Sequence, residues 1–519
     1  MNVKKTYLFT SYLLIGISLL SGSLLINSCK QKSNLSYELT GDTIADGKNL
    51  VQIHCTKCHE LVPVDAITKD VWKFHALPSM AHYFGIRTYM DDYYKNEGDT
   101  SGLTLQEWRA ITYYYQKLAP ASPIAAKPPV PLVKDWAGFK LKTPAPAAAN
   151  DICYTTLAAF DPLNHKIYTS DYVKNNFTEW NSNLKPLGSV DVPSGAVDAV
   201  FGKDNVGNNN ATISCIGRIE PIDFLNGKVI NVDLNKKSSE NQTLIASEVA
   251  RPVQTVKGDF NKDGLEDLVV LGQGHFKGGV YLMTQNKDHS YIQTNISDKP
   301  GAVQAVVGDF DNDGWQDLMV LFGSKDEGLW LFLNDHKGGF TAKSLLRFPP
   351  VYGSTSFQLA DLDHDGKLDL IYTCGYNYHN SRILKPYHGL YIFKNMGNWN
   401  FKQQWFYPID GCTKALTADF NGDGKLDIAT IAFYADLQNN PAEGFIYFEQ
   451  ETPFSFKPHA VPVSQYGRWM TMDIGDVNND GKPDIILGNY SMGFEFQPGL
   501  KPFWSKNLPF IVLENNFRK

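Results

Sequence analysis

Short apolar runs separated by polar turns fill the C-terminal two-thirds of the chain. Runs of three to five residues that are rich in β-branched or aromatic side chains and bounded by glycine are typical of buried strands. Several strands in each unit of about 50 residues are typical of the blades of a β-propeller. The clearest runs are Leu268–Leu271, Gly279–Leu282, Leu318–Leu321, Gly328–Phe332, Gly389–Phe393 and Ile485–Leu487.

The N-terminal part has a different, helical pattern. Gly47–His54 predicts a short helix. A second helix is expected after Thr104 and Glu107, which have the spacing of a capping box. Trp108, Ile111, Tyr115 and Leu118 then recur at helical spacing. The sequence therefore predicts a small all-α domain followed by an all-β domain.

Acidic loops precede the predicted strands at regular intervals. The pattern Asp-x-[Asp/Asn]-x-Asp-Gly-x-x-Asp occurs five times. Side-chain oxygens at positions 1, 3, 5 and 9, with a carbonyl at position 7, can surround one hard cation, and a flexible all-oxygen cage favours Ca²⁺ over Mg²⁺. The expected ligands are Asp259, Asn261, Asp263, Asp267; Asp309, Asp311, Asp313, Asp317; Asp361, Asp363, Asp365, Asp369; Asp419, Asn421, Asp423, Asp427; and Asp476, Asn478, Asp480, Asp484.

The flanks of these loops distinguish them from EF-hands. An EF-hand loop ends in a bidentate Glu at position 12 and lies between helices, whereas strand-like runs follow here. The motif Gly-Asp-Phe-Asn-x-Asp-Gly closely resembles the repeats of the FG-GAP/VCBS family. That resemblance implies a seven-bladed propeller of the integrin-head type, over about residues 151–519. Two degenerate units, through Phe160–Lys166 and Phe201–Asp204, would complete the seven.

A different motif lies in the N-terminal helical part, namely Cys55-Thr56-Lys57-Cys58-His59. Two cysteines three positions apart, with histidine directly after the second, form the attachment signature of a c-type haem. The thiols of Cys55 and Cys58 would bond to the haem and His59 would ligate its iron. The alternatives are a redox-active disulfide and half of a zinc site, but the surrounding sequence lacks a βαβ pattern and a second Cys/His pair.

The helices around this motif resemble the first and last helices of a small cytochrome c, which places the haem domain at about residues 41–122. Trp72–Met80 resembles the Leu-Pro-x-Met segments that supply an axial thioether in exported cytochromes. Met80 is therefore the expected sixth ligand, with Met90, His82 and His75 as alternatives. The further alternative is that Met80 only fills the core.

The N-terminus predicts the compartment. Lys4 and Lys5 precede the apolar stretch 7–26, and Ile26–Cys29 resembles a lipobox. A signal peptide (1–28), acylation of Cys29 and a tether (29–40) would place the chain on a bacterial cell envelope. An uncleaved anchor is the alternative, since the stretch is long enough to span a membrane. A Pro- and Ala-rich linker is expected at 123–150.

Net charge and cysteine content bear on nucleic-acid binding, on cation binding and on disulfide formation. The net charge is −7, and no basic or aromatic run indicates nucleic-acid binding. Aspartates clustered in five turns would repel one another without cations, so about five Ca²⁺ ions are expected to be part of the fold. Four more cysteines either form disulfides or are buried thiols: Cys153, Cys215, Cys374 and Cys412.

The propeller face opposite the acidic loops is the expected binding surface. It should carry the residues just before each first strand and the long inserts Cys374–His388, Tyr434–Glu443 and Tyr490–Trp504. The alternative, which is equally open, is that these residues only fill the channel mouth and the cores of the loops and bind no ligand. The candidate ligand-binding residues are Arg251, Gln254, Gln304, Tyr376, Arg382, Lys414, Arg468 and Trp469.

Two functions fit these features. The first is an envelope-anchored cytochrome that transfers electrons to a redox partner while the propeller binds a partner or ligand. In the second, the propeller is a redox enzyme or lyase acting on an envelope substrate such as a glycan, with the haem as electron acceptor. No catalytic residue is assigned, because the sequence shows no nucleophile–base pairing and no phosphate loop. A purely adhesive binder leaves the haem unexplained.

Overall fold

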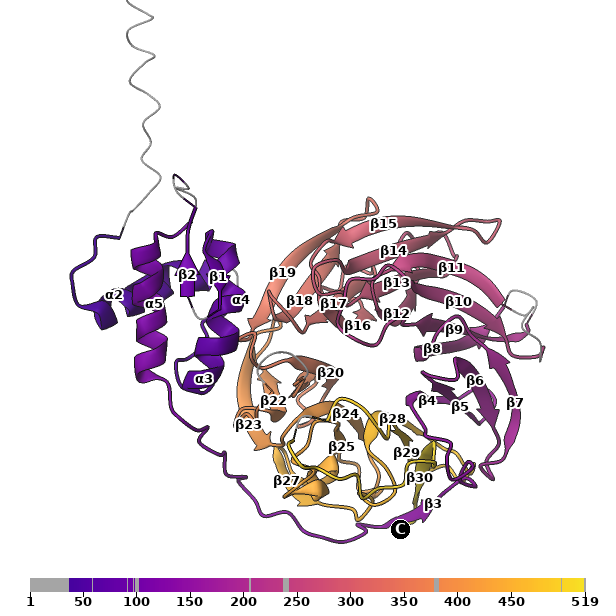
Figure 1. The fold of residues 1–519 in the computed structure, drawn as a ribbon. Coiled ribbons are helices and arrows are strands. Elements are labelled where there is room, and N and C mark those ends of the chain that lie inside the picture. Colours follow the sequence, from indigo (N-terminus) through magenta and orange to yellow (C-terminus); the bar gives the residue numbers. More distant parts are fainter. Residues whose placement is uncertain are drawn as a thin grey trace, which may run out of the picture.

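The structure, a computed structural model, consists of a small N-terminal helical unit and a ring of seven β-sheets. It describes residues 37–57, 59–90, 92–96, 98, 102–204, 207–236, 242–377, 382–495 and 497–517. Cys29 and Cys58 lie outside these residues. Figure 1 shows the helical unit beside the ring, next to β19 and β23.

The helical unit is built from short elements. They are α2 (Thr43–His54), η1 (Cys55–Lys57), α3 (Lys69–Val71), η2 (Trp72–Ala76), α4 (Leu77–Ala81), η3 (His82–Phe84), β1 (Arg87–Tyr89), β2 (Asp92–Tyr94) and α5 (Leu105–Leu118). Both predicted helices are confirmed, and the capping box of Thr104 and Glu107 starts α5. Leu118, expected on the buried face, is instead exposed at the end of that helix.

The first and last helices of this unit pack tightly against each other. Gly47 of α2 lies so close to α5 that an added Cβ would be 2.4 Å from the carbonyl oxygen of Ala110. Any larger residue would push the helices apart. Leu50, Trp72, Trp108 and Ile111 form the buried centre.

Seven four-stranded antiparallel sheets form the propeller, as predicted. From inner to outer strand, the first four blades are β4 (Thr155–Asp161), β5 (Lys166–Asp171), β6 (Asn176–Trp180), β7 (Pro186–Asp191); β8 (Ala196–Lys203), β9 (Asn209–Cys215), β10 (Gly227–Asp233), β11 (Gln242–Val249); β12 (Pro252–Gly258), β13 (Asp267–Gly272), β14 (Gly279–Gln285), β15 (Tyr291–Ser297); and β16 (Ala302–Gly308), β17 (Asp317–Phe322), β18 (Gly328–Asn334), β19 (Phe340–Arg347). The last three are β20 (Ser354–Ala360), β21 (Asp369–Cys374), β22 (Gly389–Asn395), β23 (Phe401–Pro408); β24 (Cys412–Ala418), β25 (Asp427–Ala432), β26 (Phe445–Thr452), β27 (Ser455–His459), with η5 (Pro441–Gly444) before β26; and β28 (Trp469–Gly475), β29 (Asp484–Asn489), β30 (Phe510–Asn515), β3 (Phe139–Lys142).

The segment expected to be a linker takes part in the propeller. β3 pairs with β30 and supplies the outer strand of the last blade, so residues from both ends of the propeller close the ring. Further upstream, Val133 accepts from the amide of Ala460 and donates to the carbonyl of Pro458. The predicted boundary at residue 151 is therefore too late, because these backbone groups pair with strands far along the chain.

Side chains of the inner strands join neighbouring blades. Gln254 accepts a hydrogen bond from the amide of Ala305 (2.6 Å), and Gln304 accepts one from the amide of Phe357 (3.0 Å). Asp198 and Asp473 make the same kind of contact with Thr255 and Phe160. These bonds satisfy buried backbone groups where two sheets meet.

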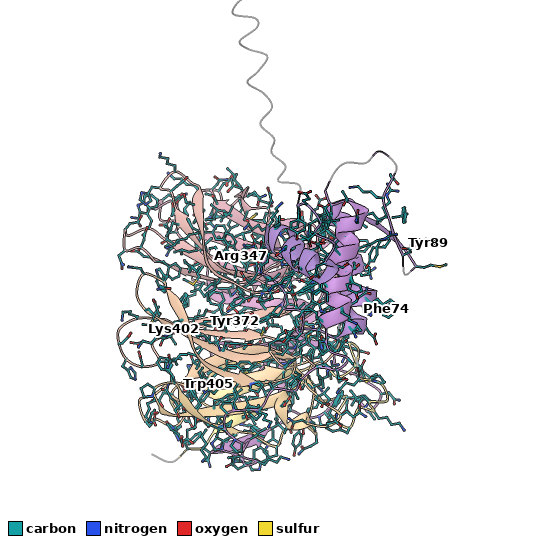
Figure 2. The ribbon with its side chains drawn as sticks, turned by 90° about the vertical axis from the view of Figure 1, so that its left-hand side faces the viewer. Phe74, Tyr89, Arg347, Tyr372, Lys402 and Trp405 are labelled. Atoms are coloured by element: carbon teal, nitrogen blue, oxygen red, sulfur yellow. The ribbon has the colours of Figure 1, made fainter. Side chains whose placement is uncertain are left out.

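The helical unit packs on the fourth and fifth blades. Val351, Ile383 and Tyr387 of the propeller contact its core. In Figure 2, Arg347 lies where the helical unit overlies the sheets, while Phe74 and Tyr89 project at the outer edge of that unit. Part of the long insert between β21 and β22 therefore forms an interface between the two parts of the chain.

Candidate functional site

All five acidic loops connect the first and second strands of a blade, from the third blade to the seventh. In each loop the aspartate at position 1 accepts hydrogen bonds from the amides at positions 5 and 6, as Asp361 does from Asp365 and Gly366. Glycine at position 6 has a positive φ in all five, for example +82° at Gly366. The predicted sharp turn is confirmed, and glycine is there because this backbone region strains other residues.

The aspartate at position 9 has a second task that the sequence pattern did not indicate. It is fully buried in every loop: Asp267, Asp317, Asp369, Asp427 and Asp484. In the fourth blade, for instance, it accepts hydrogen bonds from the amides of Phe310 and Asn334. Burial raises the pKa of all five carboxyl groups, to about 6 for Asp427 and Asp484. Position 9 thus ties the loop to the end of the third strand.

Two loops bring three carboxylates together in the geometry of a cation site. Oxygens of Asp309, Asp311 and Asp317 lie within 4.8 Å of one another, as do those of Asp361, Asp363 and Asp369. The other three loops have asparagine at position 3, which contributes an amide oxygen. In the fifth blade Lys394 forms ion pairs with Asp363 and Asp365, two of the expected ligands. Calcium binding by the loops stays a prediction.

The acidic loops also connect neighbouring blades. The carbonyl at position 2 accepts a hydrogen bond from a side chain of the next blade in four cases. These are Phe260 from Asn334, Phe310 from Trp399, Leu362 from Gln450 and Phe420 from Asn515. The conformation of each loop therefore bears on the contact between two sheets.

The haem-attachment motif begins where α2 ends. Cys55 opens η1 and is half-buried against the helical core. Nδ1 of His59 lies 2.7 Å from the carbonyl oxygen of Glu60. A proton on Nδ1 that is donated to this carbonyl leaves the lone pair of Nε2 available to a metal. Burial lowers the pKa of His59. The charges of Arg347 and Asp326 in the propeller also act electrostatically on this pKa.

The candidate sixth ligands differ sharply in exposure. Met80 lies on α4 and is half-buried against the helical core. Met90 is 84% exposed, and His75 and His82 are exposed as well. The indole Nε1 of Trp108 is buried without a hydrogen-bond partner among the described residues. Nε1 of Trp330 and Nε1 of Trp469 in the propeller are likewise buried without a partner among these residues.

A cavity of about 300 Å³ lies at the channel mouth, on the face opposite the acidic loops. Its floor contains the second residue of every inner strand: Thr156, Val197, Val253, Val303, Thr355, Thr413 and Met470. Arg251, His275 and Lys414 contribute nitrogen groups, while Tyr376, Phe433, Tyr434 and Phe494 contribute aromatic rings. The cavity is therefore apolar and aromatic with a few basic groups, as small-molecule sites commonly are.

Three of the eight predicted ligand-face residues line this cavity, namely Arg251, Tyr376 and Lys414. The prediction needs correction for the others. Gln254 and Gln304 bind the next blade, and Trp469 is 1% exposed and packs in the core between the last two blades. Arg468 is buried and donates to the carbonyls of Phe433, Gly493 and Phe494. Arg382 is exposed and does not line the cavity.

A buried polar cluster next to this cavity was not foreseen. Ser354 lines the cavity and donates to Glu327, and its Oγ lies 2.6 Å from the hydroxyl of Tyr372. Burial raises the pKa of Glu327 to about 8 and lowers that of nearby Lys385 to about 8. Glu327 directly precedes β18, in a loop whose sequence gives no sign of burial.

The remaining cysteines are buried, free thiols: Cys153, Cys215, Cys374 and Cys412. Burial raises the pKa of each, which makes them poor nucleophiles at neutral pH. None of the helices in the described part of the chain combines the length and apolar character needed to span a membrane.

Comparisons with known proteins bear on the propeller. The model of the FG-GAP-like repeat matches residues 259–320 and 309–372. No curated protein matches the sequence. Among solved structures, an ancestral GH74 enzyme is 9% identical with a TM-score of 0.47, covering 77% of this chain and 52% of that enzyme. The chain thus spans about half of that enzyme's length.

Two further structures are similar at the same low level. The WD40 propeller domain of Doa1 is 12% identical with a TM-score of 0.43, covering 72% of this chain and 97% of that one. BBS1N in complex with ARL6DN is 10% identical with a TM-score of 0.44, covering 73% and 98%. All three scores lie below 0.5, so the architecture rests on the sheets described above. The chain carries FG-GAP-like repeats within a seven-bladed β-propeller.

Proposed function

We propose that this chain is an envelope-anchored c-type cytochrome that transfers electrons, and that its propeller binds a ligand or partner protein at the channel mouth. The observation that carries the proposal is the Cys-x-x-Cys-His motif at the end of α2, with Nδ1 of His59 held by the carbonyl of Glu60. This is the arrangement expected of a metal-ligating histidine.

Four residues of the N-terminal part would hold a haem. Cys55 and Cys58 would hold it through two thioether bonds, and His59 and Met80 would be its axial ligands. The unpaired Nε1 of Trp108 offers a buried donor to an acidic group of such a cofactor. A bound haem supplies one-electron redox chemistry, and Met/His ligation raises its potential.

The remaining parts of the proposal follow from the sequence. Acylation of Cys29 would tether the chain to a membrane, and the acidic loops would hold about five Ca²⁺ ions that stabilise the propeller. A redox partner would approach the outer edge of the helical unit, where Phe74 and Tyr89 are exposed. Large exposed apolar side chains are candidates for contact with another protein.

Covalent haem attachment tests the proposal directly. The full chain would be produced with c-type haem maturation, denatured, and examined by mass spectrometry and by the pyridine-haemochrome spectrum. Wild type should retain haem after denaturation, the double variant Cys55→Ala/Cys58→Ala should not, and Cys153→Ala, which removes a buried thiol elsewhere, should behave as wild type. A matured wild-type chain without covalent haem would refute the proposal.

The second candidate function is a redox enzyme whose substrate binds in the channel-mouth cavity. A chain of contacts leads from the cavity to the helical unit and favours it. Tyr372, hydrogen-bonded to Ser354, stacks on Phe348 at 4.3 Å, and Tyr352 lies between Phe348 (6.2 Å) and Tyr387 (4.8 Å). Tyr387 packs on the helical core.

A screen of the purified, oxidised protein for haem reduction by sugars and phenols distinguishes the two functions. Reduction that saturates with substrate and is lost when Thr355 on the cavity floor is replaced by a bulky residue, as in Thr355→Phe, would support the enzyme. Reduction only by protein donors would support electron transfer with the propeller as a binding module.

A further inference from the structure

The residue that directly precedes the inner strand occupies the same place in every blade. In six blades its carbonyl accepts a hydrogen bond from the amide of the residue that follows the second strand, as Gly301 does from Gly323. In the sixth blade Gly411 accepts from Tyr434 instead. The seven residues are Tyr154, Gly195, Arg251, Gly301, Gly353, Gly411 and Arg468.

Arg251 departs from this pattern. Four of the seven residues have a positive φ, and three of these are glycine; the fourth is Arg251, with a φ of +49°. A residue with a Cβ is strained in this region by about 1 kcal/mol or more. Glycine would avoid that strain, as it does in the three neighbouring blades that follow. Strain that persists in this way often marks a functional position.

The guanidinium of Arg251 is largely without partners. Arg251 is 7% exposed and lines the cavity. Of its five N–H donors, the described residues accept one hydrogen bond, from Nη2 to the carbonyl of Ile219 at 3.1 Å, while Nε is buried without a partner. Arg468, at the same position of the last blade, instead donates to three carbonyls and stacks on Phe433 at 3.8 Å. Arg468 therefore stabilises the loop that contains Gly493 and Phe494, whereas Arg251 has no comparable set of bonds among the described residues.

Arg251 is one of two strong bases that line the cavity. Burial lowers the pKa of Arg251, whereas Tyr376, Tyr434, Glu220 and Asp223 act in the opposite direction, and an arginine remains protonated. Lys414 also lines the cavity, but its charge acts on the buried acids Asp198 and Asp473. Glu220 and Asp223 do not line the cavity, and Asp223 accepts from the amides of Phe276 and Lys277.

We infer that the channel-mouth cavity binds a small organic acid, in which a carboxylate is attached to a single ring, with the carboxylate on Arg251 and the ring against the aromatic wall. A planar guanidinium matches a carboxylate in a bidentate, charge-assisted contact. The rings of Tyr376 and Tyr434 lie 5.9 Å apart in an edge-to-face arrangement, and both line the cavity. A volume of about 300 Å³ suits a ligand of one ring. The inference rests on the proposed binding role of the propeller and names its ligand class.

The test measures binding of four probes to the full, matured chain by isothermal titration calorimetry. Benzoate and glucuronate represent an aromatic acid and a sugar acid, and benzamide and glucose are their uncharged counterparts. At least one acid should bind, roughly tenfold or more tightly than its counterpart, because a charge-assisted hydrogen bond is lost with the neutral probe. The acid that binds identifies the ring type. Failure of both acids to bind at millimolar concentration, or equal binding of acid and neutral probe, would overturn the inference.

Variants of Arg251 separate ligand binding from a structural role. Arg251→Gln should weaken binding of the acid roughly tenfold or more, and Arg251→Lys should restore part of it. Lys277→Gln removes an exposed cation of the same blade outside the cavity and should bind as wild type. Arg251→Gly should abolish binding while the melting midpoint stays the same or rises, since glycine relieves the strain. A lower midpoint with unchanged binding would show that Arg251 is structural and overturn the inference.

The haem content of the same samples keeps the two proposals apart. Acid binding does not depend on the helical unit, so a haem-free chain that still binds the acid refutes only the electron-transfer proposal. A haem-loaded chain that binds neither acid refutes only the assignment of the ligand class.

Discussion

Glu327 illustrates how burial and charge conflict at a single residue. Its carboxylate accepts from the amide and hydroxyl of Ser354 through Oε1, while Oε2 has no partner among the described residues. Burial raises its pKa from the ordinary 4.5 to about 8. The folded protein therefore holds a proton on Glu327 at a pH at which the unfolded chain has lost it.

Glu327→Gln should therefore change how stability depends on pH. Because the folded pKa is raised, the stability contributed by protonated Glu327 is complete below about pH 4.5 and is lost as the pH rises through about 8. Glutamine does not titrate, so the variant should gain at least about 1 kcal/mol relative to wild type between pH 5 and pH 8.5. Chemical denaturation at both pH values measures the gain. The exposed Glu451→Gln should show no such trend, and a pH-independent difference for Glu327→Gln would contradict the expectation.

Met80→Ala tests the sixth ligand of the proposed haem. If the Met80 thioether ligates the iron, oxidised wild type should show a weak sulfur-to-iron band at the red end of the visible spectrum, and the variant should lack it and have a lower potential. Met90→Ala is the matched control, because Met90 is exposed and should leave the spectrum unchanged. An unchanged spectrum in Met80→Ala would move the assignment to a histidine or to Met90.

The predictions from the sequence were least accurate for residues that have two structural roles. The spacing of the acidic loops correctly located every turn, but position 9 also receives two backbone amides, one of them from the distant end of the third strand. Trp469 starts an inner strand and fills the core, while Gln254 lies within an inner strand and bonds the next blade. Sequence spacing determines where a residue lies along its strand, whereas its partner across two sheets depends on the closed ring.

At the scale of elements, the acidic loop is the repeated structural unit. Since its position 2 carbonyl bonds the next blade in four cases, a loop that loses its cation should loosen two sheets. Chelation should lower the melting midpoint of the propeller by about 5 °C or more, because like charges are then uncompensated and ligand stabilisation is lost. Differential scanning calorimetry with and without chelator measures this shift, and covalent haem should be unaffected.

A single loop can be tested with Asp361→Asn, which keeps an oxygen for the amide of Asp365 and removes one charge. Metal analysis should find one Ca²⁺ fewer than in wild type, because each of the five loops would hold its own ion. Asp191→Ala, at an exposed aspartate outside the loops, should bind as many ions as wild type. If wild type contains no calcium and chelator has no effect, the loops are only solvated turns.

Elements with a local signal were predictable, and those without one were not. The strands after each acidic loop and the helix that starts at the Thr104 capping box follow from neighbouring residues. β3 does not, because Phe139–Lys142 is short, lies in a Pro- and Ala-rich stretch and finds its partner only in β30. A strand whose stability comes entirely from a distant partner has no local sequence signal.

At the scale of the whole molecule, the contact between the helical unit and the propeller was not predicted, since nothing in the linker indicates a fixed arrangement. Ile383→Glu would place a charge against the helical core and should separate the two parts. Small-angle X-ray scattering should then give a larger radius of gyration with unchanged secondary structure. Ile292→Glu, at an exposed isoleucine of the third blade, is the control. An unchanged radius in Ile383→Glu would mean that this contact does not hold the parts together.

The strand that closes the ring has a consequence for the order of assembly. Lys142 of β3 and Glu514 of β30 form an ion pair at 2.7 Å although 372 residues separate them. A ribosome makes β3 before every other strand of the propeller, and its partner β30 emerges only after all the others. Until then β3 has no neighbour on its pairing edge, and unpaired edges invite aggregation. The helical unit can form during this interval, whereas the ring can close only after β30 has been made. Truncation within the last strand should therefore spare the helical unit and leave an open ring.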